Sequence, residues 1–125
     1  MIVADTDVLI DFLRGREPAA RVSAAIAAGA LATTAITAFE LRSGARTAKE
    51  TTATEGLLAG LSVLPFDARA SEAAAACRRE LEAEGRTIGM ADYLIAGTCI
   101  SRAAVLLTRN RRHFDRIRQL VVEGL

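Results

Sequence analysis

The segment MIVADTDVLIDFL, residues 1–13, decides the fold. Its first part, residues 2–5, is a short apolar run that ends in an acid and predicts a buried β-strand. Its second part, residues 8–13, predicts a helix. Short buried strands that lead directly into helices are typical of a parallel sheet covered by helices on both faces, so the segment indicates an α/β fold.

The same alternation continues along the chain. Further strands are predicted at residues 30–34, 62–64, 105–108 and 120–123, and helices at residues 19–28, 37–46, 50–61, 68–84 and 90–102. Gly15 and Pro18 mark a turn after the first helix. We therefore predict a single domain, residues 1–125, folded as an α/β/α sandwich around a mainly parallel sheet of about five strands.

Composition limits the classes of protein to consider. Apolar residues make up 51% of the 125 residues but aromatics only 4%, so Ala, Leu, Val and Ile must build one core. The net charge of +1 excludes a global attraction to nucleic acid or to a membrane. No apolar stretch reaches the roughly 20 residues of a membrane span, and no signal peptide is evident, so we expect a cytoplasmic protein. Cys77 and Cys99 form no C-x-x-C pair and are expected to be buried free thiols.

Four acidic or amide side chains stand at junctions between predicted elements. Asp5 and Asn110 follow strands, while Glu40 and Asp92 fall near the starts of helices. Ligands of parallel sheets bind outside the carboxyl ends of the strands, where these side chains can converge. Clustered carboxylates repel one another unless a divalent cation is bound, and an oxygen-only cluster suits Mg²⁺ or Mn²⁺. The pattern predicts metal-dependent chemistry on a phosphate.

Each of these residues also has a purely structural interpretation. Asp5 can cap the helix that follows it. Thr37-x-x-Glu40 has the sequence of a capping box. Asp92 can interact with the positive end of its own helix, although it shares a face with apolar residues. Asn110 is a common turn residue.

Neighbouring polar residues are candidates for supporting roles. Thr6 and Thr108 can hydrogen-bond the cluster or the phosphate, or act as caps. Asp7 lies close enough in sequence to support the cluster, whereas Asp11 is expected to be solvated. His113, the only histidine, is either structural or in contact with the substrate.

Residues 109–118 contain five Arg and one Asp, a local charge of +4. Arg109, Arg111 and Arg112 are candidates for contacts with nucleic-acid phosphates. The alternative is a solvated surface or a docking site for an acidic partner. No aromatic platform for stacking bases is evident.

Four segments together resemble the PIN domain, and most closely the VapC-type toxin ribonucleases. They are DTDVLI (residues 5–10), TAFEL (37–41), GMADYLIA (89–96) and LTRNRRHF (107–114). The resemblance covers essentially the whole chain. It implies a Mg²⁺- or Mn²⁺-dependent endoribonuclease that serves as the toxin of a type II toxin–antitoxin pair, with RNA as substrate, an antitoxin protein as partner and a homodimeric state.

The resemblance also assigns roles to residues. It implies that Asp5, Glu40, Asp92 and Asn110 are catalytic, and that the first three hold the metal. Many relatives carry Asp where this chain has Asn110. An amide can ligate through oxygen but supplies no charge, which bears on a second metal position. Asp115, five residues on, fits the spacing less well.

Two other functions are compatible with parts of the pattern. Asp5-x-Asp7 after a first strand resembles the nucleophile motif of haloacid-dehalogenase-type phosphatases. The Thr expected two residues after Asp7 is absent, since Leu9 stands there, and the only Lys, Lys49, lies in a polar helical region. A non-catalytic binding module is the third hypothesis, in which Asn110 marks a degraded site.

Overall fold

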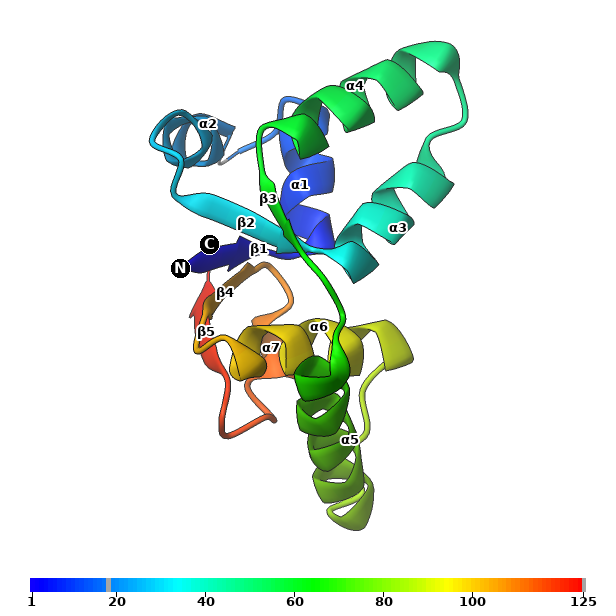
Figure 1. The fold of residues 1–125 in the computed structure, drawn as a ribbon, viewed down its shortest axis with the longest axis vertical. Helices are drawn as coiled ribbons and strands as arrows, with labels where there is room; N and C mark the ends of the chain where they lie inside the picture. The colour runs from blue at the N-terminus through cyan, green and yellow to red at the C-terminus, as the bar shows by residue number, and fades with distance from the viewer. Residues whose placement is uncertain (18, 125) are drawn as a thin grey trace.

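The computed structural model describes residues 1–17 and 19–124 and contains a sheet of five parallel strands in the order β3-β2-β1-β4-β5 (Figure 1). The strands are β1 Ile2–Ala4, β2 Leu31–Thr34, β3 Ser62–Leu64, β4 Val105–Thr108 and β5 Val121–Gly124. The predicted α/β fold with a parallel sheet is confirmed. Pro18, predicted to mark a turn, lies outside the described residues.

Helices cover both faces of the sheet (Figure 1). On one face lie α1 Thr6–Leu13, α2 Ala19–Ala27, α3 Ala35–Gly44 and α4 Ala48–Ala59; on the other lie α5 Ala68–Ala83, α6 Met90–Ser101 and α7 Arg111–Phe114. Each predicted helix is present, with ends that differ by at most two residues. The four-residue helix α7 was not predicted.

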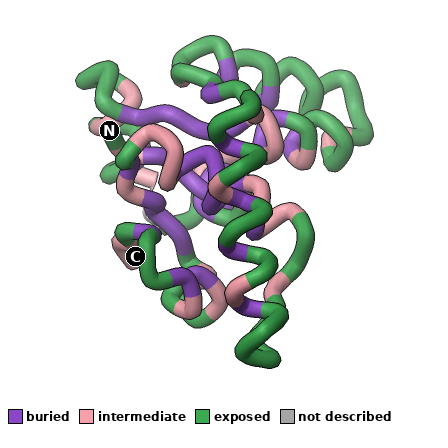
Figure 2. The backbone as a smooth tube through the Cα atoms, turned by 60° about the horizontal axis from the view of Figure 1, so that its bottom comes forward, coloured by how far each residue is buried: buried purple, intermediate pink, exposed green. Residues whose placement is uncertain are grey.

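Alternation along the strands divides the apolar interior into two clusters. Val3 belongs to the cluster under α5, α6 and α7, whereas the next residue, Ala4, belongs to the cluster under α1 to α4. Leu106 and Leu107 divide in the same way because successive side chains of a strand point to opposite faces. The buried segments of Figure 2 accordingly run through the middle of the molecule. The core lies on both sides of a fully covered sheet.

Helix α3 begins two residues earlier than predicted. Its N-cap is Thr34, whose hydroxyl accepts a hydrogen bond from the Thr37 backbone N–H at 3.0 Å, so Thr37 lies inside the helix. The capping box of this region is formed by Thr47 and Glu50 at the start of α4. The capping-box interpretation of Glu40 is therefore wrong, and its side chain is left for other contacts.

Helices α5 and α6 pack closely in the second cluster. A Cβ placed at Gly97 of α6 would lie 2.6 Å from Ala70 O and from two atoms of Ala74, so only glycine fits there without movement. Cys77 and Cys99 are buried free thiols in these same helices, as predicted, and burial raises the pKa of Cys99 to about 12. None of the described helices is both long and apolar enough to cross a membrane.

Candidate functional site

The order of the strands places a topological switch point at the carboxyl edge of the sheet. β1 lies between β2 and β4. The helices that follow β1 and β2 cover one face of the sheet, whereas α6 and α7, which precede and follow β4, cover the other face. Such a switch point is where parallel α/β sheets bind ligands. Asp5 directly follows β1, and its backbone N–H donates to Leu107 O of β4 at 2.9 Å. The first predicted site residue thus lies at the switch point.

Asp5 is buried, with 5% of its surface exposed, and both carboxylate oxygens accept hydrogen bonds. Oδ1 accepts from the Thr6 backbone N–H at 2.8 Å, and Oδ2 accepts from Thr108 Oγ1 at 2.7 Å. Asp5 is therefore the N-cap of α1 and also part of the polar cluster. The pKa of Asp5 is raised to about 6, mainly by burial. The two hydrogen bonds lower this pKa, and the charges of Asp7 and Asp92 add to the rise.

Glu40 approaches the cluster from the second turn of α3. Its Oε1 accepts a hydrogen bond from Thr6 Oγ1 at 2.6 Å. Thr6 therefore binds both acids: its backbone N–H contacts Asp5 and its hydroxyl contacts Glu40. Thr37 supports the arrangement, because its hydroxyl lies 3.0 Å from that of Thr6.

Asp92 enters from the opposite face of the sheet, as the third residue of α6. Its Oδ2 lies 3.3 Å from His113 Nδ1 of α7, and the same nitrogen lies 2.9 Å from Asn110 Nδ2. Asn110 precedes α7 without capping it through its side chain, and its backbone N–H donates to Thr108 Oγ1 at 2.8 Å. All four predicted residues thus belong to one connected polar region.

His113 is the member of this region that sequence reasoning left undecided. The available signal was its spacing of three residues from Asn110, which places two side chains on the same side of a helical turn. The spacing predicts a contact between the two side chains only if residues 111–114 are helical. That segment was too short to predict as a helix.

The arginines after β4 are mostly paired. Arg109 forms an ion pair with Asp11, which is 3% exposed and so is buried rather than solvated as expected. This pairing ties the loop after β4 to α1 and restrains the predicted RNA contact of Arg109. Arg111 pairs with the exposed Asp115 at 3.1 Å, so that acid does not replace the missing Asp of the cluster. Arg112 is exposed and has no ion pair among the described residues.

Two hollows border the cluster. A polar pocket of about 410 Å³ is lined by Thr108, Arg109, Arg111 and Gly124. A larger, mainly apolar groove of about 420 Å³ lies between α1, α3 and α4, and Glu40 is part of its lining. The apolar side chains of Phe39 and Met90, which are 68% and 52% exposed, stand next to Glu40 and near Asp92 in sequence.

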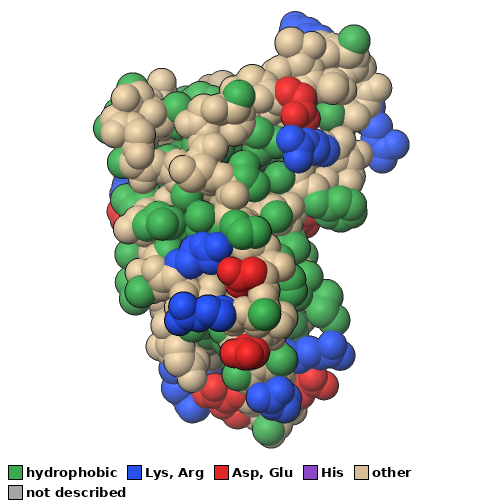
Figure 3. Space-filling view, viewed as in Figure 1, with side chains coloured by type: hydrophobic (Ala, Val, Ile, Leu, Met, Phe, Trp, Pro, Cys, Tyr) green, Lys and Arg blue, Asp and Glu red, His purple; other side chains and the backbone are tan. Residues whose placement is uncertain are grey.

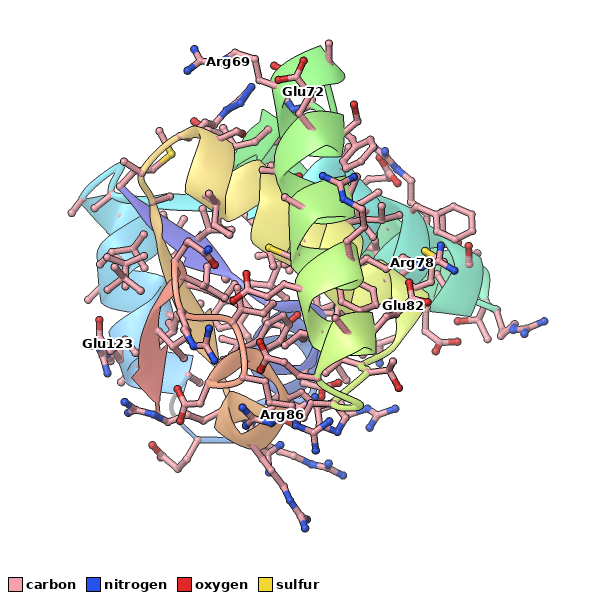
Figure 4. All side chains as sticks on the ribbon, turned by 90° about the horizontal axis from the view of Figure 1, so that it is seen from below. Arg69, Glu72, Arg78, Glu82, Arg86 and Glu123 are labelled. Atoms are coloured by element: carbon pink, nitrogen blue, oxygen red, sulfur yellow. The ribbon has the colours of Figure 1, made fainter. Side chains whose placement is uncertain are left out.

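Charges of both signs are interspersed over the surface around α5 (Figure 3). Arg78 and Glu82 project from the same side of this helix (Figure 4) and are joined at 2.9 Å. Arg118 contacts Glu80 and Glu84. This part of the surface therefore presents no broad field of one sign to a polyanion.

Comparison with known proteins identifies the family. Residues 2–120 match the PIN domain family. This chain belongs to the PIN-domain family. Ribonuclease VapC10 of Mycobacterium tuberculosis is 37% identical over 122 residues, which cover 96% of this chain and 90% of that protein.

Two further relatives extend the comparison across nearly the whole PIN domain. The tRNA(fMet)-specific endonuclease VapC of Shigella flexneri is 29% identical over 123 residues, covering 95% of this chain and 93% of that protein. The crystal structure of VapBC2 from Rickettsia felis, bound to a DNA fragment from its promoter, includes a chain with a TM-score of 0.90 and 25% identity. It covers 100% of this chain and 99% of that one. The chain is a PIN-domain protein of the VapC group.

PIN-domain membership implies a divalent cation. The side chains at the site can be compared with the oxygen ligands that such a cation needs. No group of three His, Cys, Asp or Glu side chains in residues 1–17 and 19–124 is arranged to hold a metal ion. Asp5 and Asp92 are nevertheless close enough that the charge of Asp92 raises the pKa of Asp5. Mg²⁺ commonly uses one or two carboxylates, with waters and phosphate oxygens completing its shell. The residues therefore fit a hard divalent cation, with Glu40 as a predicted third ligand.

The phosphatase hypothesis finds no support in the site. Its motif expects Thr where this chain has Leu9, and Leu9 is fully buried in the apolar cluster under α1 to α4. The family match is to the PIN domain over almost the entire chain.

Proposed function

We propose that this chain is a metal-dependent endoribonuclease that hydrolyses RNA phosphodiester bonds and acts as the toxin of a type II toxin–antitoxin pair. The observation that carries the proposal is the chain of hydrogen bonds that connects Asp5, Glu40 and Asp92, which come from three different elements. Membership of the VapC group, whose relatives are named as ribonucleases, supports RNA as the substrate.

The proposed roles follow from the surroundings of each acid. Asp5 and Asp92 would hold the cation, either Mg²⁺ or Mn²⁺, and the buried Asp5 would be the better anchor because two donors fix its orientation. A bound cation would lower the pKa of a water and neutralise charge on the scissile phosphate. Glu40 has one oxygen held by Thr6, and its other oxygen is proposed to accept the proton of the attacking water.

Cleavage of a mixed RNA pool tests the proposal. Purified protein is incubated with Mg²⁺, with Mn²⁺ and with EDTA, and cleavage is expected only with metal. D92A and D5N should each slow cleavage about 100-fold or more, the usual scale when a charge-stabilising group is removed from an active site. D115N is the matched control, because Asp115 is exposed and faces Arg111, and it should cleave like the wild type.

The outcomes separate the remaining functions. Full cleavage by D5N would refute the assigned roles. A folded, antitoxin-free protein that binds Mn²⁺ but cleaves no RNA would support the non-catalytic binding module.

We further propose an antitoxin protein as partner and the cytoplasm as the place of action. The support is that structures similar to this chain include VapBC complexes from Rickettsia felis and Salmonella typhimurium. Co-expression with the protein encoded beside it should yield a complex that copurifies and cleaves no RNA. Cleavage by the intact complex at the rate of the free chain would contradict this assignment.

A homodimer is also proposed. Phe39 and Met90 support it, because large exposed apolar side chains are common in subunit interfaces. Light scattering after size exclusion should give a dimer for the wild type and a monomer for F39D. A wild-type monomer at all accessible concentrations would refute the proposal.

A further inference from the structure

The three acids of the site differ in what holds them. Asp5 receives hydrogen bonds from Thr6 and Thr108, and Glu40 receives one from Thr6. Asp92, with 22% of its side chain exposed, has one polar side-chain partner among the described residues, His113. The N-cap residue of α6, Gly89, has no side chain that could hold this carboxylate. The orientation of Asp92 therefore depends on α7.

We propose that His113 is a positioning residue that donates Nδ1–H to Asp92 and so orients this carboxylate for the metal, and that Asn110 in turn orients His113. The role of orienting a metal ligand rests on the proposed metal-dependent function. The contacts of His113 with Asp92 and Asn110 do not depend on that function. Phe114, which is fully buried, anchors the short helix that carries His113. The imidazole is thereby held beside Asp92 although 41% of its side chain is exposed.

The direction of the hydrogen bonds follows from the two neighbours of Nδ1. A bare Nδ1 would accept from Asn110 but would turn its lone pair toward the carboxylate of Asp92, which is repulsive. A protonated Nδ1 has one N–H, which it donates to Asp92 Oδ2, and the amide oxygen of Asn110 shares this hydrogen when it faces the ring. Turning the amide by 180° exchanges its oxygen and nitrogen without changing its heavy-atom shape, so this orientation requires no movement of neighbouring groups. We therefore place the proton on Nδ1, because no lone pair then faces the carboxylate.

The same contacts connect the two proposed metal ligands across the sheet edge. Thr108 donates to Asp5 and accepts from the backbone N–H of Asn110, whose side chain contacts His113, and His113 contacts Asp92. The loop after β4 therefore sets the relative orientation of Asp5 and Asp92. In this arrangement Asn110 supplies an acceptor for His113 without adding another negative charge beside Asp92. An amide at this position is then suited to its task rather than a sign of a degraded site.

The imidazole can be observed directly because His113 is the only histidine of the chain. Long-range ¹H–¹⁵N spectra of tag-free protein without metal will contain one imidazole, and they distinguish protonated from unprotonated ring nitrogens. We expect a proton on Nδ1 in the wild type and its transfer to Nε2 in D92A, since the partner of a ring nitrogen decides the tautomer. A neutral ring with its proton on Nε2 in the wild type would overturn the proposal.

Substitutions at residue 113 test the effect on the metal. H113L removes the donor and is expected to weaken Mn²⁺ binding, measured by calorimetry, by about tenfold or more, as for other groups that orient metal ligands. H113N places an amide N–H near the position of Nδ1 and should restore most of the affinity, whereas H113Q, which reaches the position of Nε2, should not. D115N is the control on the same segment and should bind Mn²⁺ like the wild type.

A double-mutant cycle separates positioning from any other role of His113. If His113 acts through Asp92, H113L should weaken Mn²⁺ binding in the wild-type background and have almost no effect in D92A. An undiminished loss in the D92A background, or wild-type affinity in folded H113L, would overturn the inference. Failure of the wild type to bind Mn²⁺ would count against the proposed function. The tautomer measurement would still show whether His113 donates Nδ1–H to Asp92. Circular dichroism of each variant establishes that it is folded.

Discussion

Asp5 is a carboxyl group buried in the candidate site, and burial raises its pKa from 3.8 to about 6. Between these values the folded protein keeps a proton that the unfolded chain releases, so the free energy of unfolding falls as the pH rises through this window. A shift of about two pKa units corresponds to roughly 3 kcal/mol. In metal-free protein, the stability of the wild type relative to D5N should therefore drop by about that amount between about pH 4 and pH 7.

The free energy of unfolding of the wild type and of D5N is measured with urea across this pH range. The difference between the two proteins removes the contribution of all other titrating groups. Adding Mg²⁺ near pH 7 should restore stability to the wild type and not to D5N, because the cation binds the ionised carboxylate. Parallel stability curves for the two proteins would contradict the buried, proton-binding state of Asp5.

Thr108 supplies a hydrogen bond that partly offsets this burial. T108V keeps the shape of the side chain but leaves Asp5 Oδ2 and the Asn110 backbone N–H without their partner. A lost partner for a buried polar group costs about 1–3 kcal/mol. We expect T108V to lower the free energy of unfolding by that amount and to slow RNA cleavage, both measured near pH 7. T108S retains the hydroxyl and is the control; equal losses in T108S and T108V would assign the effect to packing instead.

At the scale of elements, the contact between α5 and α6 depends on the absence of a side chain at Gly97. G97A places a methyl group against the backbone of α5, and overpacking of this kind costs about 1–3 kcal/mol. Gly56 provides the matched control, because it lies in the exposed interior of α4 with nothing within 4 Å of the added Cβ. G56A should stabilise the protein by up to about 1 kcal/mol through helix propensity. The midpoint of thermal unfolding should fall in G97A and rise in G56A. Midpoints that do not shift in these opposite directions would contradict this packing.

The elements also indicate how far the sequence is predictive. The strands were found within one residue because short apolar runs flanked by turns and helix caps have few other interpretations. The start of α3 was missed because Thr34 and Thr37 are both plausible caps, and only the register of the preceding strand decides between them. Helix α7 is one turn long, and its stability comes from the burial of Phe114 rather than from any periodic pattern.

The site shows the same division. The sequence identified Asp5, Glu40 and Asp92 because a charged group beside apolar segments is costly to bury unless it is paired or binds a metal. Asp11 was misjudged, since it is buried and forms an ion pair with Arg109, which is 98 residues away in the chain. Such long-range partners are set by the folded structure, and local spacing carries no information about them. The contact of His113 with Asp92 belongs to the same class.

At the scale of the whole molecule, the site draws residues from both faces of the sheet. Asp5 and Glu40 are carried by the layer of α1 to α4, whereas Asp92 and His113 come from α6 and α7. The two apolar clusters lie on opposite faces of the same strands, and Ile36 of α3 packs against the cluster under α5 to α7. The alignment of the acids therefore requires both layers to be folded together. We therefore propose that residues 1–125 form a single cooperative domain.

Coincident unfolding transitions test this proposal. Tyr93 is the only tyrosine in a chain without tryptophan, and it is buried in the cluster under α5 to α7. L9A removes a fully buried side chain from the opposite cluster and should cost about 2–5 kcal/mol. In a two-state domain, its urea midpoint must fall equally by far-UV circular dichroism and by Tyr93 fluorescence, although Tyr93 lies across the sheet. A Tyr93 transition that stays at the wild-type midpoint while the circular dichroism shifts would mean that the two layers unfold separately, and the alignment of the acids would then be lost before the chain is unfolded.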